Sequence, residues 1–269
     1  PSGYKDLDNI IAGWQKSDLV ILAARPSMGK SVLALNFAHK VATKSEMPVL
    51  IFSLEMSKDQ LVDRMLAMES GVDAWNIRTG SLSNDDWEKI STAMGTLAEA
   101  PIYIDDTAGI TVSDLRTKAR REQHQRQLGL IIVDYLQLMS GGSRFGSDGN
   151  RVQEISEISR GLKSIARELN VPIIALSQLS RSVESRSPQI PQLSDLRESG
   201  SIEQDADMVM FIYRDEYYNP ENTEKPNVAD IMIRKHRNGP IGNVELFFDA
   251  NKQIFKSLDR KTTKTPFDS

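Results

Sequence analysis

One short stretch of the chain has the residues for binding phosphate. Gly29, Lys30 and Ser31 follow an apolar run at 19–22 and precede a segment with helical spacing at 32–41. In a strand–loop–helix arrangement, backbone N–H groups and the helix dipole converge on one concavity that attracts phosphate. The Lys30 ammonium can reach the β- and γ-phosphates, and the Ser31 hydroxyl can ligate Mg²⁺. The stretch therefore predicts a nucleotide phosphate site.

This predicted loop departs from the common pattern G-x-x-x-x-G-K-[ST] at its first position. Its residues are Ala24, Arg25, Pro26, Ser27, Met28, Gly29, Lys30 and Ser31. Glycine at the first position would permit unusual backbone angles. Ala24 therefore implies either a backbone conformation open to L-residues or local strain. Taken alone, the stretch is also compatible with an ordinary strand–turn–helix corner.

Polar residues follow three other apolar runs. Asp134 directly follows the apolar run at 130–133. Glu55 comes just after the run at 49–53, and Gln178 directly follows the run at 173–177. Ligands bind beyond the carboxyl ends of the strands in open α/β sheets, so these side chains are expected near the phosphates.

Each of the three has a possible chemical role and a simpler alternative. Asp134 could hold Mg²⁺ through water, or only cap its strand. Glu55 could orient and deprotonate a water that attacks the γ-phosphate, or only favour the start of the next helix. Gln178 could hydrogen-bond the γ-phosphate and pass its loss on to the following segment, or be a surface amide.

Lys235 and Arg237 lie two residues apart at the end of a predicted strand, so they share one face. They precede a turn at 238–242. A guanidinium at a hairpin tip can act as an arginine finger on the nucleotide of a neighbouring subunit. A solvated strand end is the alternative, and only an oligomer would favour the finger.

The order of predicted elements indicates the fold class. Strands at 19–23, 49–53, 101–105, 130–134 and 172–177 alternate with helical segments, which predicts a mostly parallel central sheet flanked by helices. After 201 the chain changes to successive strands, predicting an antiparallel C-terminal extension. We expect one α/β domain over 1–260 and a polar, disordered tail at 261–269.

Two stretches have no clear secondary-structure pattern. The first, 140–150, contains four glycines. The second, 180–204, is longer than most loops inside compact domains, and long loops are often functional. It carries Arg181, Arg186 and Arg197, which suit contacts with a nucleic-acid phosphate backbone. Aromatic residues are nearly absent from both stretches, so base stacking is not expected to dominate.

Composition limits the classes of protein. The 269 residues include no cysteine, which excludes disulfides and thiolate metal sites and fits a reducing cytoplasm. The net charge of −4 requires any nucleic-acid site to concentrate positive charge locally. No apolar run approaches the ~18 residues of a membrane span, so no membrane partner is expected. The chain starts at Pro1, from which we expect a piece of a longer protein with an upstream domain.

Several motifs together closely resemble the bacterial replicative DNA helicase family of the DnaB type, over residues 3–259. They are 24–31 (ARPSMGKS), 53–56 (SLEM), 133–138 (VDYLQL), 175–181 (ALSQLSR), 197–207 (RESGSIEQDAD) and 237–240 (RNGP). The resemblance implies a RecA-like P-loop NTPase fold and an ATP-driven, 5′-to-3′ helicase motor. It further implies a homo-hexameric ring around single-stranded DNA, with ATP and Mg²⁺ between subunits.

The resemblance also implies residue roles. Lys30 and Ser31 would bind phosphates and Mg²⁺, Asp134 would hold the metal, and Glu55 would be the general base. Gln178 would sense the γ-phosphate, while Lys235 and Arg237 would act in trans. Arg197, Glu198 and Gly200 would contact the DNA backbone. Family members work in a primosome with a primase and a helicase loader, which would be partners here.

Two other functions share part of this site. A RecA-like recombination ATPase would use the same loop, Glu55 and Asp134, but would form filaments. A switch-type P-loop protein would bind ATP mainly to assemble. ATP hydrolysis stimulated by single-stranded DNA would favour the helicase over the switch, and a closed ring would favour it over the filament.

Overall fold

A single mixed sheet forms the centre of the molecule. The computed structural model describes residues 1–140 and 151–258. Across these residues the strands lie in the order β3-β2-β4-β5-β1-β6-β7-β8-β9. The parallel strands are β1 (Leu19–Ala24), β2 (Val49–Ser53), β3 (Ile102–Asp105), β4 (Leu130–Asp134), β5 (Ile173–Gln178) and β6 (Met208–Tyr213). The antiparallel strands are β7 (Val228–His236), β8 (Gly242–Asp249) and β9 (Ile254–Ser257). The predicted parallel sheet with an antiparallel extension is confirmed.

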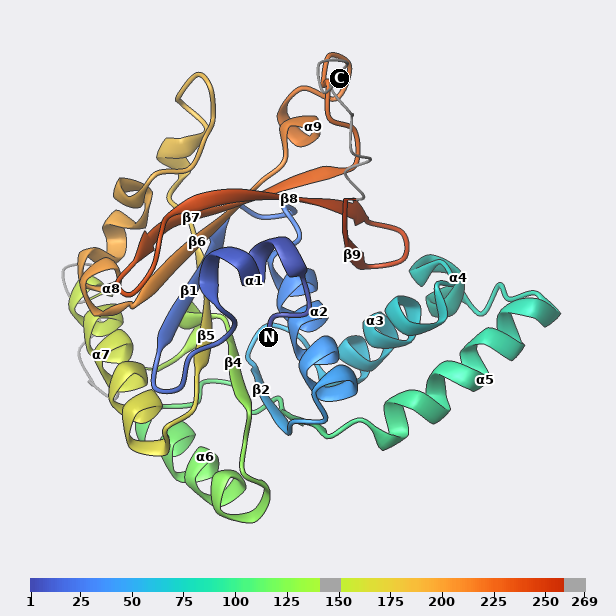
Figure 1. The fold of residues 1–269 in the computed structure, drawn as a ribbon, viewed down its shortest axis with the longest axis horizontal. Coiled ribbons are helices and arrows are strands. Elements are labelled where there is room, and N and C mark those ends of the chain that lie inside the picture. The colour runs from blue at the N-terminus through green and yellow to red at the C-terminus, as the bar shows by residue number, and fades with distance from the viewer. Residues whose placement is uncertain (141–150, 259–269) are drawn as a thin grey trace, which may run out of the picture.

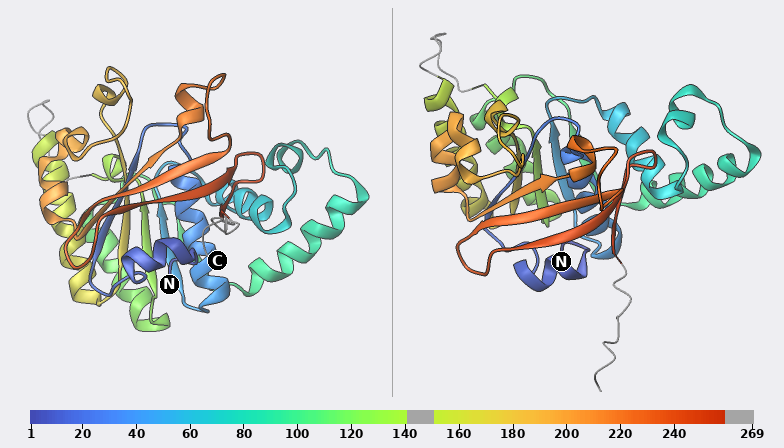
Figure 2. Two further views of the ribbon diagram at one scale, coloured as in Figure 1. Left: turned by 45° about the horizontal axis from the view of Figure 1, so that its top comes forward. Right: turned by 90° about the horizontal axis from the view of Figure 1, so that it is seen from above.

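Helices cover both faces of the sheet (Figures 1 and 2). They pack on apolar side chains that alternate between the two faces of the central strands. In β1, Val20 and Leu22 belong to one apolar cluster, and Leu19 and Ile21 belong to the other. The first cluster includes residues of α1 (Lys5–Ile11) and α2 (Lys30–Lys44). The second includes residues of α6 (Val112–Arg126) and α7 (Arg151–Leu169). This two-sided burial explains why the central strands are continuous apolar runs.

Three helices form an arm that extends from the β2–β3 side of the sheet (Figure 1). They are α3 (Lys58–Ser70), α4 (Ala74–Thr79) and α5 (Asn84–Glu99). Capping boxes at Ser57 and Ser83 satisfy backbone N–H groups at the starts of α3 and α5. The sequence pattern predicts α3 and α5 but not α4, because six residues are too few for a periodic signal. The arm places the Arg64 side chain of α3 beside the loop that follows β1.

The stretch 180–204 is more ordered than its sequence predicts. It contains two 3₁₀ segments, η3 (Arg181–Val183) and η4 (Leu193–Ser199), followed by α8 (Gly200–Asp205). Buried Val183, Leu196 and Ile202 belong to the second apolar cluster and hold the stretch against the sheet. Their spacing follows neither a helical nor a strand period, which explains why the sequence shows no clear secondary-structure pattern here. Residues 141–150 and the tail at 259–269 lie outside the described part of the chain.

Shorter helical segments complete the described chain. They are η1 (Leu136–Leu138) after β4 and α9 (Asp215–Tyr218) after β6. In the described ranges, no helix has the length and apolar character to cross a bilayer.

Candidate active site

The loop after β1 has the backbone of a phosphate cradle. Gly29 is the N-cap of α2 with φ of 93°, and its carbonyl oxygen accepts a hydrogen bond of 2.8 Å from the Leu33 N–H. A Cβ on Gly29 would lie 3.1 Å from the Phe255 ring and 3.3 Å from the Phe248 ring. Both the positive φ and the close aromatic rings require glycine at this position. The first N–H groups of α2 are therefore presented at the end of β1.

Ala24 fits its position without strain. It is the last residue of β1, pairs in register with Gln178, and accepts a 3.1 Å hydrogen bond from the Leu179 N–H. Its φ is not positive. The loop therefore starts from regular strand backbone, which resolves the question that the sequence raises about this position.

A cavity of about 460 Å³ opens beside this loop. Its lining includes most of the predicted site: Ala24, Arg25, Pro26, Ser27, Gly29, Lys30, Ser31, Glu55 and Gln178. Met28 is 1% exposed, so its side chain belongs to the core beneath the loop and only its backbone can face a ligand. The cavity thus brings residues from β1, β2 and β5 together, as expected from their shared sheet edge.

Asp134 lies buried next to the cradle. Asp134 is 5% exposed. Burial raises the pKa of its carboxyl group, while the positive charge of Lys30 and the neighbouring Ser31 side chain oppose the rise. Its Oδ1 atom is buried and has no hydrogen-bond partner among the residues that the structure describes. A buried carboxylate oxygen without a partner, beside a serine hydroxyl, is a donor set that fits Mg²⁺ and its waters.

Lys30 is held as a partly desolvated cation. Burial lowers the pKa of Lys30, and the charges of Asp134 and Glu55 oppose that shift. Its Nζ atom lies 4.4 Å from the centre of the Tyr135 ring. Removing an ammonium from water is costly unless anions compensate it. A polyphosphate in the cavity would supply that compensation.

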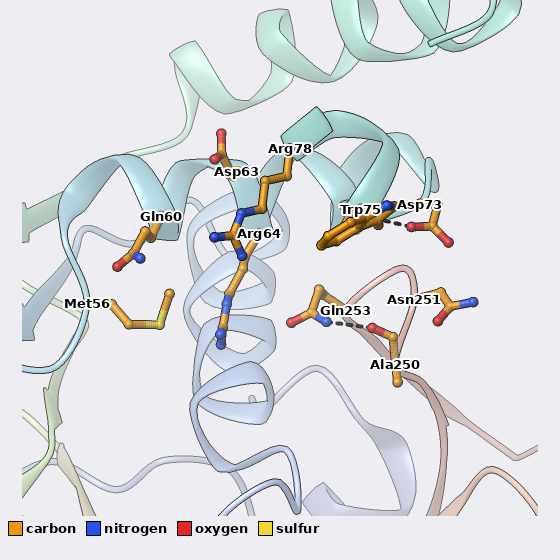
Figure 3. A pocket seen from close by; sticks show the side chains of 11 residues that line it. Met56, Gln60, Asp63, Arg64, Asp73, Trp75, Arg78, Ala250, Asn251 and Gln253 are labelled. Atoms are coloured by element: carbon orange, nitrogen blue, oxygen red, sulfur yellow. Dashed lines mark hydrogen bonds between the residues drawn. The ribbon is translucent and has the colours of Figure 1, made fainter. Parts of the chain in front are cut away.

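Arg64 is a site residue that sequence reasoning missed. It comes from α3, lines the cavity together with Glu55, and has its pKa lowered by burial. The opposing charges are those of Asp134 and Glu55. Arg64 also borders a second pocket of about 460 Å³, where Figure 3 shows it below Arg78. The sequence did contain a signal for Arg64. A helix that begins three residues after Glu55 starts beside the site, so a side chain of that helix can reach the same cavity as Glu55.

The end of β6 and the antiparallel extension close the other side of the cavity. Arg214, just after β6, places its guanidinium 4.6 Å from the centre of the Phe248 ring. Both line the cavity, together with Ala250 and Gln253 near the β8–β9 turn. None of these residues was predicted, because no local pattern connects them with the loop after β1.

Gln178 is held in place by a neighbouring amide. Gln137 donates from Nε2 to Ser177 Oγ at 3.0 Å, and the Gln178 N–H donates to Gln137 Oε1 at 3.4 Å. The end of β5 is therefore tied to the segment that follows Asp134. The Gln178 side chain remains exposed and lines the cavity, as a γ-phosphate sensor must.

Lys235 and Arg237 lie on the side of the sheet where the parallel strands begin, opposite the side where they end and the cavity opens. His236 pairs with Met208 at the start of β6, and Met208 pairs with Val20 near the start of β1. The loop after β1 is at the far end of the same strand, so neither cation can reach the phosphates of its own chain. Lys235 Nζ donates to the Glu203 carbonyl, and Arg237 donates to the Gln204 carbonyl and pairs with Asp207 at 3.5 Å. The Arg237 side chain is still 47% exposed.

The predicted DNA-contacting residues lie on one connection. Arg197 and Glu198 are in η4, and Gly200 begins α8. The structure describes their backbone only, so the placement of these side chains stays a prediction.

Comparison with known proteins identifies the family. The family model described as "DnaB-like helicase C terminal domain" matches residues 1–257. The chain belongs to this family. It is 56% identical over 261 residues to "Replicative DNA helicase DnaC" of Bacillus subtilis, covering 97% of this chain and 57% of that relative. The chain thus spans a little over half the length of this curated relative.

Solved structures of similar proteins share the fold. One of them, described as an ATPase domain, has a TM-score of 0.91 and 40% identity, covering 96% of this chain and 91% of that chain. A second structure, "The Structure Of A DnaB-Like Replicative Helicase And Its Interactions With Primase", has the same TM-score and identity and covers 96% of this chain and 62% of that chain. These matches confirm the predicted fold class.

Gly29 provides a direct test of the cradle. We expect Gly29→Ala to destabilise the fold by about 1–2 kcal/mol through its left-handed backbone, and to abolish the rise in melting temperature on adding nucleotide. Gly71→Ala is the matched control, because Gly71 also has a positive φ, of 69°, but no neighbour in the described part of the chain lies within 4 Å of its Cβ position. Thermal melts with and without ATP measure both effects. An equal nucleotide-induced rise in the two variants would contradict the assignment.

Proposed function

We propose that this chain is the ATP-hydrolysing motor domain of a replicative DNA helicase, acting at interfaces between copies of itself. One observation carries the proposal. The phosphate cavity lies at one edge of the sheet, and Lys235 and Arg237 lie at the other. A ring or filament that stacks these two edges would complete each cavity with cations from the next subunit.

Within one subunit, groups from the loop and from the ends of neighbouring strands would act on ATP. The N–H groups of the loop and the Lys30 ammonium hold the β- and γ-phosphates, and Glu55 accepts the proton of the attacking water. Ser31 and Asp134 would hold Mg²⁺. When bound, that ion would neutralise charge on the β- and γ-phosphates. The Arg214–Phe248 wall is the remaining side of the cavity, and we place the nucleoside there.

The neighbouring subunit would supply the missing charge. Arg237 acts as the finger on the γ-phosphate, and Lys235 assists from the same face of β7. Loss of the γ-phosphate would change the hydrogen bond of Gln178 and, through it, the stretch 180–204. That stretch carries Arg197, Glu198 and Gly200, which contact the backbone of single-stranded DNA. Repeated around a hexamer, this cycle would move the protein along the strand.

We infer that the partners are single-stranded DNA, a primase and a helicase loader. One structural neighbour is a DnaB-like replicative helicase described with its interactions with primase.

The first experiment is ATP turnover by the assembled protein with and without oligo-dT. The proposal requires stimulation by the oligonucleotide. Turnover indifferent to DNA would favour the switch-type alternative, and filaments in place of closed rings would favour the recombination ATPase.

Arg197→Ala tests the DNA assignment. Loss of one phosphate contact should weaken oligo-dT binding and lower the slope of log K against log[salt] by about 0.7. Arg121→Ala is the control, since Arg121 lies on the exposed face of α6 and its side chain is 66% exposed. Fluorescence anisotropy titrations at several salt concentrations give both quantities. An unchanged affinity and slope would remove Arg197 from the DNA site.

A further inference from the structure

The Arg25 side chain has partners outside the phosphate loop. Its Nη1 donates to the Leu179 carbonyl at 2.7 Å. Its Nε and Nη2 both donate to Glu184 Oε1, at 2.9 and 2.7 Å. The side chain is 8% exposed. A guanidinium bound in this way presents a fixed geometry, and it is not available as a freely moving phosphate ligand.

These partners belong to the segment that follows the sensor strand. Leu179 comes directly after Gln178, and its N–H also donates to the Ala24 carbonyl at 3.1 Å. Glu184 comes directly after η3, within the stretch 180–204. One guanidinium therefore links the phosphate loop, the end of β5 and the start of the stretch that leads to Arg197.

The link continues toward η4. Arg186 forms two hydrogen bonds to the Asp195 carboxylate, at 3.0 and 2.8 Å. Asp195 is 2% exposed, its carbonyl accepts from the Ser180 N–H at 3.0 Å, and its carboxylate accepts from the Gln192 N–H at 2.7 Å. Asp195 lies two residues before Arg197. The guanidinium of Arg186 is thus bound within the protein, which differs from the phosphate contact expected from its sequence position.

We propose that the Arg25–Glu184 pair is a positioning contact that couples nucleotide binding to DNA binding. The proposal rests on the function proposed above and adds the route between its two sites. Nucleotide phosphates fix the loop that carries Arg25. Arg25 then fixes Glu184 and the Leu179 carbonyl, and the Arg186–Asp195 pair extends that order to the start of η4. Neither Arg25 nor Glu184 needs to touch DNA or the reacting atoms.

This coupling has a measurable definition. The coupling factor is the ratio of oligo-dT affinities with and without a non-hydrolysable ATP analogue. Thermodynamic linkage requires that oligo-dT changes the affinity for the analogue by the same factor. A contact that only stabilises the fold would change melting temperature but leave this ratio intact.

The central variant is Glu184→Gln, which keeps the shape of the side chain and removes its charge. We expect its coupling factor to fall at least fivefold toward 1, while the analogue still raises its melting temperature. Glu184→Asp keeps the charge and should recover part of the coupling. Glu221→Gln, an exposed glutamate in the turn before β7, is the control and should keep the wild-type coupling factor.

A double-mutant cycle with Arg25→Gln tests whether the two residues act through one contact. If they do, Arg25→Gln with Glu184→Gln loses no more coupling than either single variant. Additive losses would overturn the proposal, as would a wild-type coupling factor in Glu184→Gln. A wild-type protein whose DNA and nucleotide affinities are independent would instead overturn the proposed helicase function itself.

Discussion

Lys30→Ala is expected to lower ATP turnover by about a hundredfold to a thousandfold, the loss typical for removing one preorganised group that stabilises transition-state charge. Lys30 is the cation at the start of α2, and its pKa is lowered because it is partly desolvated beside Asp134 and Glu55. Its charge is therefore compensated best when phosphates fill the cavity. Phosphate release in the presence of oligo-dT and Mg²⁺ measures the effect.

Lys44→Ala is the control for this prediction. Lys44 is in the last turn of the same helix and is exposed. Its removal should leave turnover within about twofold, as expected for a surface substitution that costs at most ~0.5 kcal/mol. Comparable turnover in Lys30→Ala and Lys44→Ala would disprove the assignment of the loop, since both variants lose one positive charge from α2.

Arg237→Ala is expected to have an effect at least as large on the assembled protein. Arginine fingers contribute about 10³–10⁵ in rate, so turnover should fall by about a thousandfold or more. The fold should persist, because Lys163 also pairs with Asp207 and remains in the variant. Turnover is measured on protein shown to be assembled by its mass in solution.

Arg234→Ala separates the finger from a general loss of charge on β7. Arg234 is on β7, three residues before Arg237, and its guanidinium donates to the Asn243 side chain at 2.6 Å. We expect turnover within a few-fold of wild type in this variant. Normal turnover by assembled Arg237→Ala would leave Arg237 with only a structural role, through its contacts with Asp207 and the Gln204 carbonyl.

The fold could be predicted largely from the sequence because its strands are local, continuous apolar runs. Asp134, Glu55 and Gln178 were predictable for the same reason, since parallel strands bring their carboxyl ends to one edge. Arg64 could not be placed as easily, because its position depends on how the arm of α3, α4 and α5 packs beside the sheet.

Other site features depend on distant parts of the chain. Arg214 and Phe248 meet the phosphate loop only because β6 pairs with β1 and the antiparallel strands beyond β6 bring Phe248 close to Gly29. The partner of Arg25 is 159 positions away along the sequence, so no local pattern could reveal it. Similarly, the order of the stretch 180–204 depends on irregularly spaced apolar contacts and on the Arg186–Asp195 pair.

The central claim is that each active site combines Lys30 of one subunit with Arg237 of another. Mixing Lys30→Ala and Arg237→Ala subunits tests it most directly, because some interfaces in a mixed assembly pair an intact Lys30 with an intact Arg237. We predict that the mixture recovers a substantial fraction of wild-type ATP turnover, while each variant alone stays nearly inactive. A mixture as inactive as its two components, in an assembly of confirmed mixed composition, would contradict the shared site.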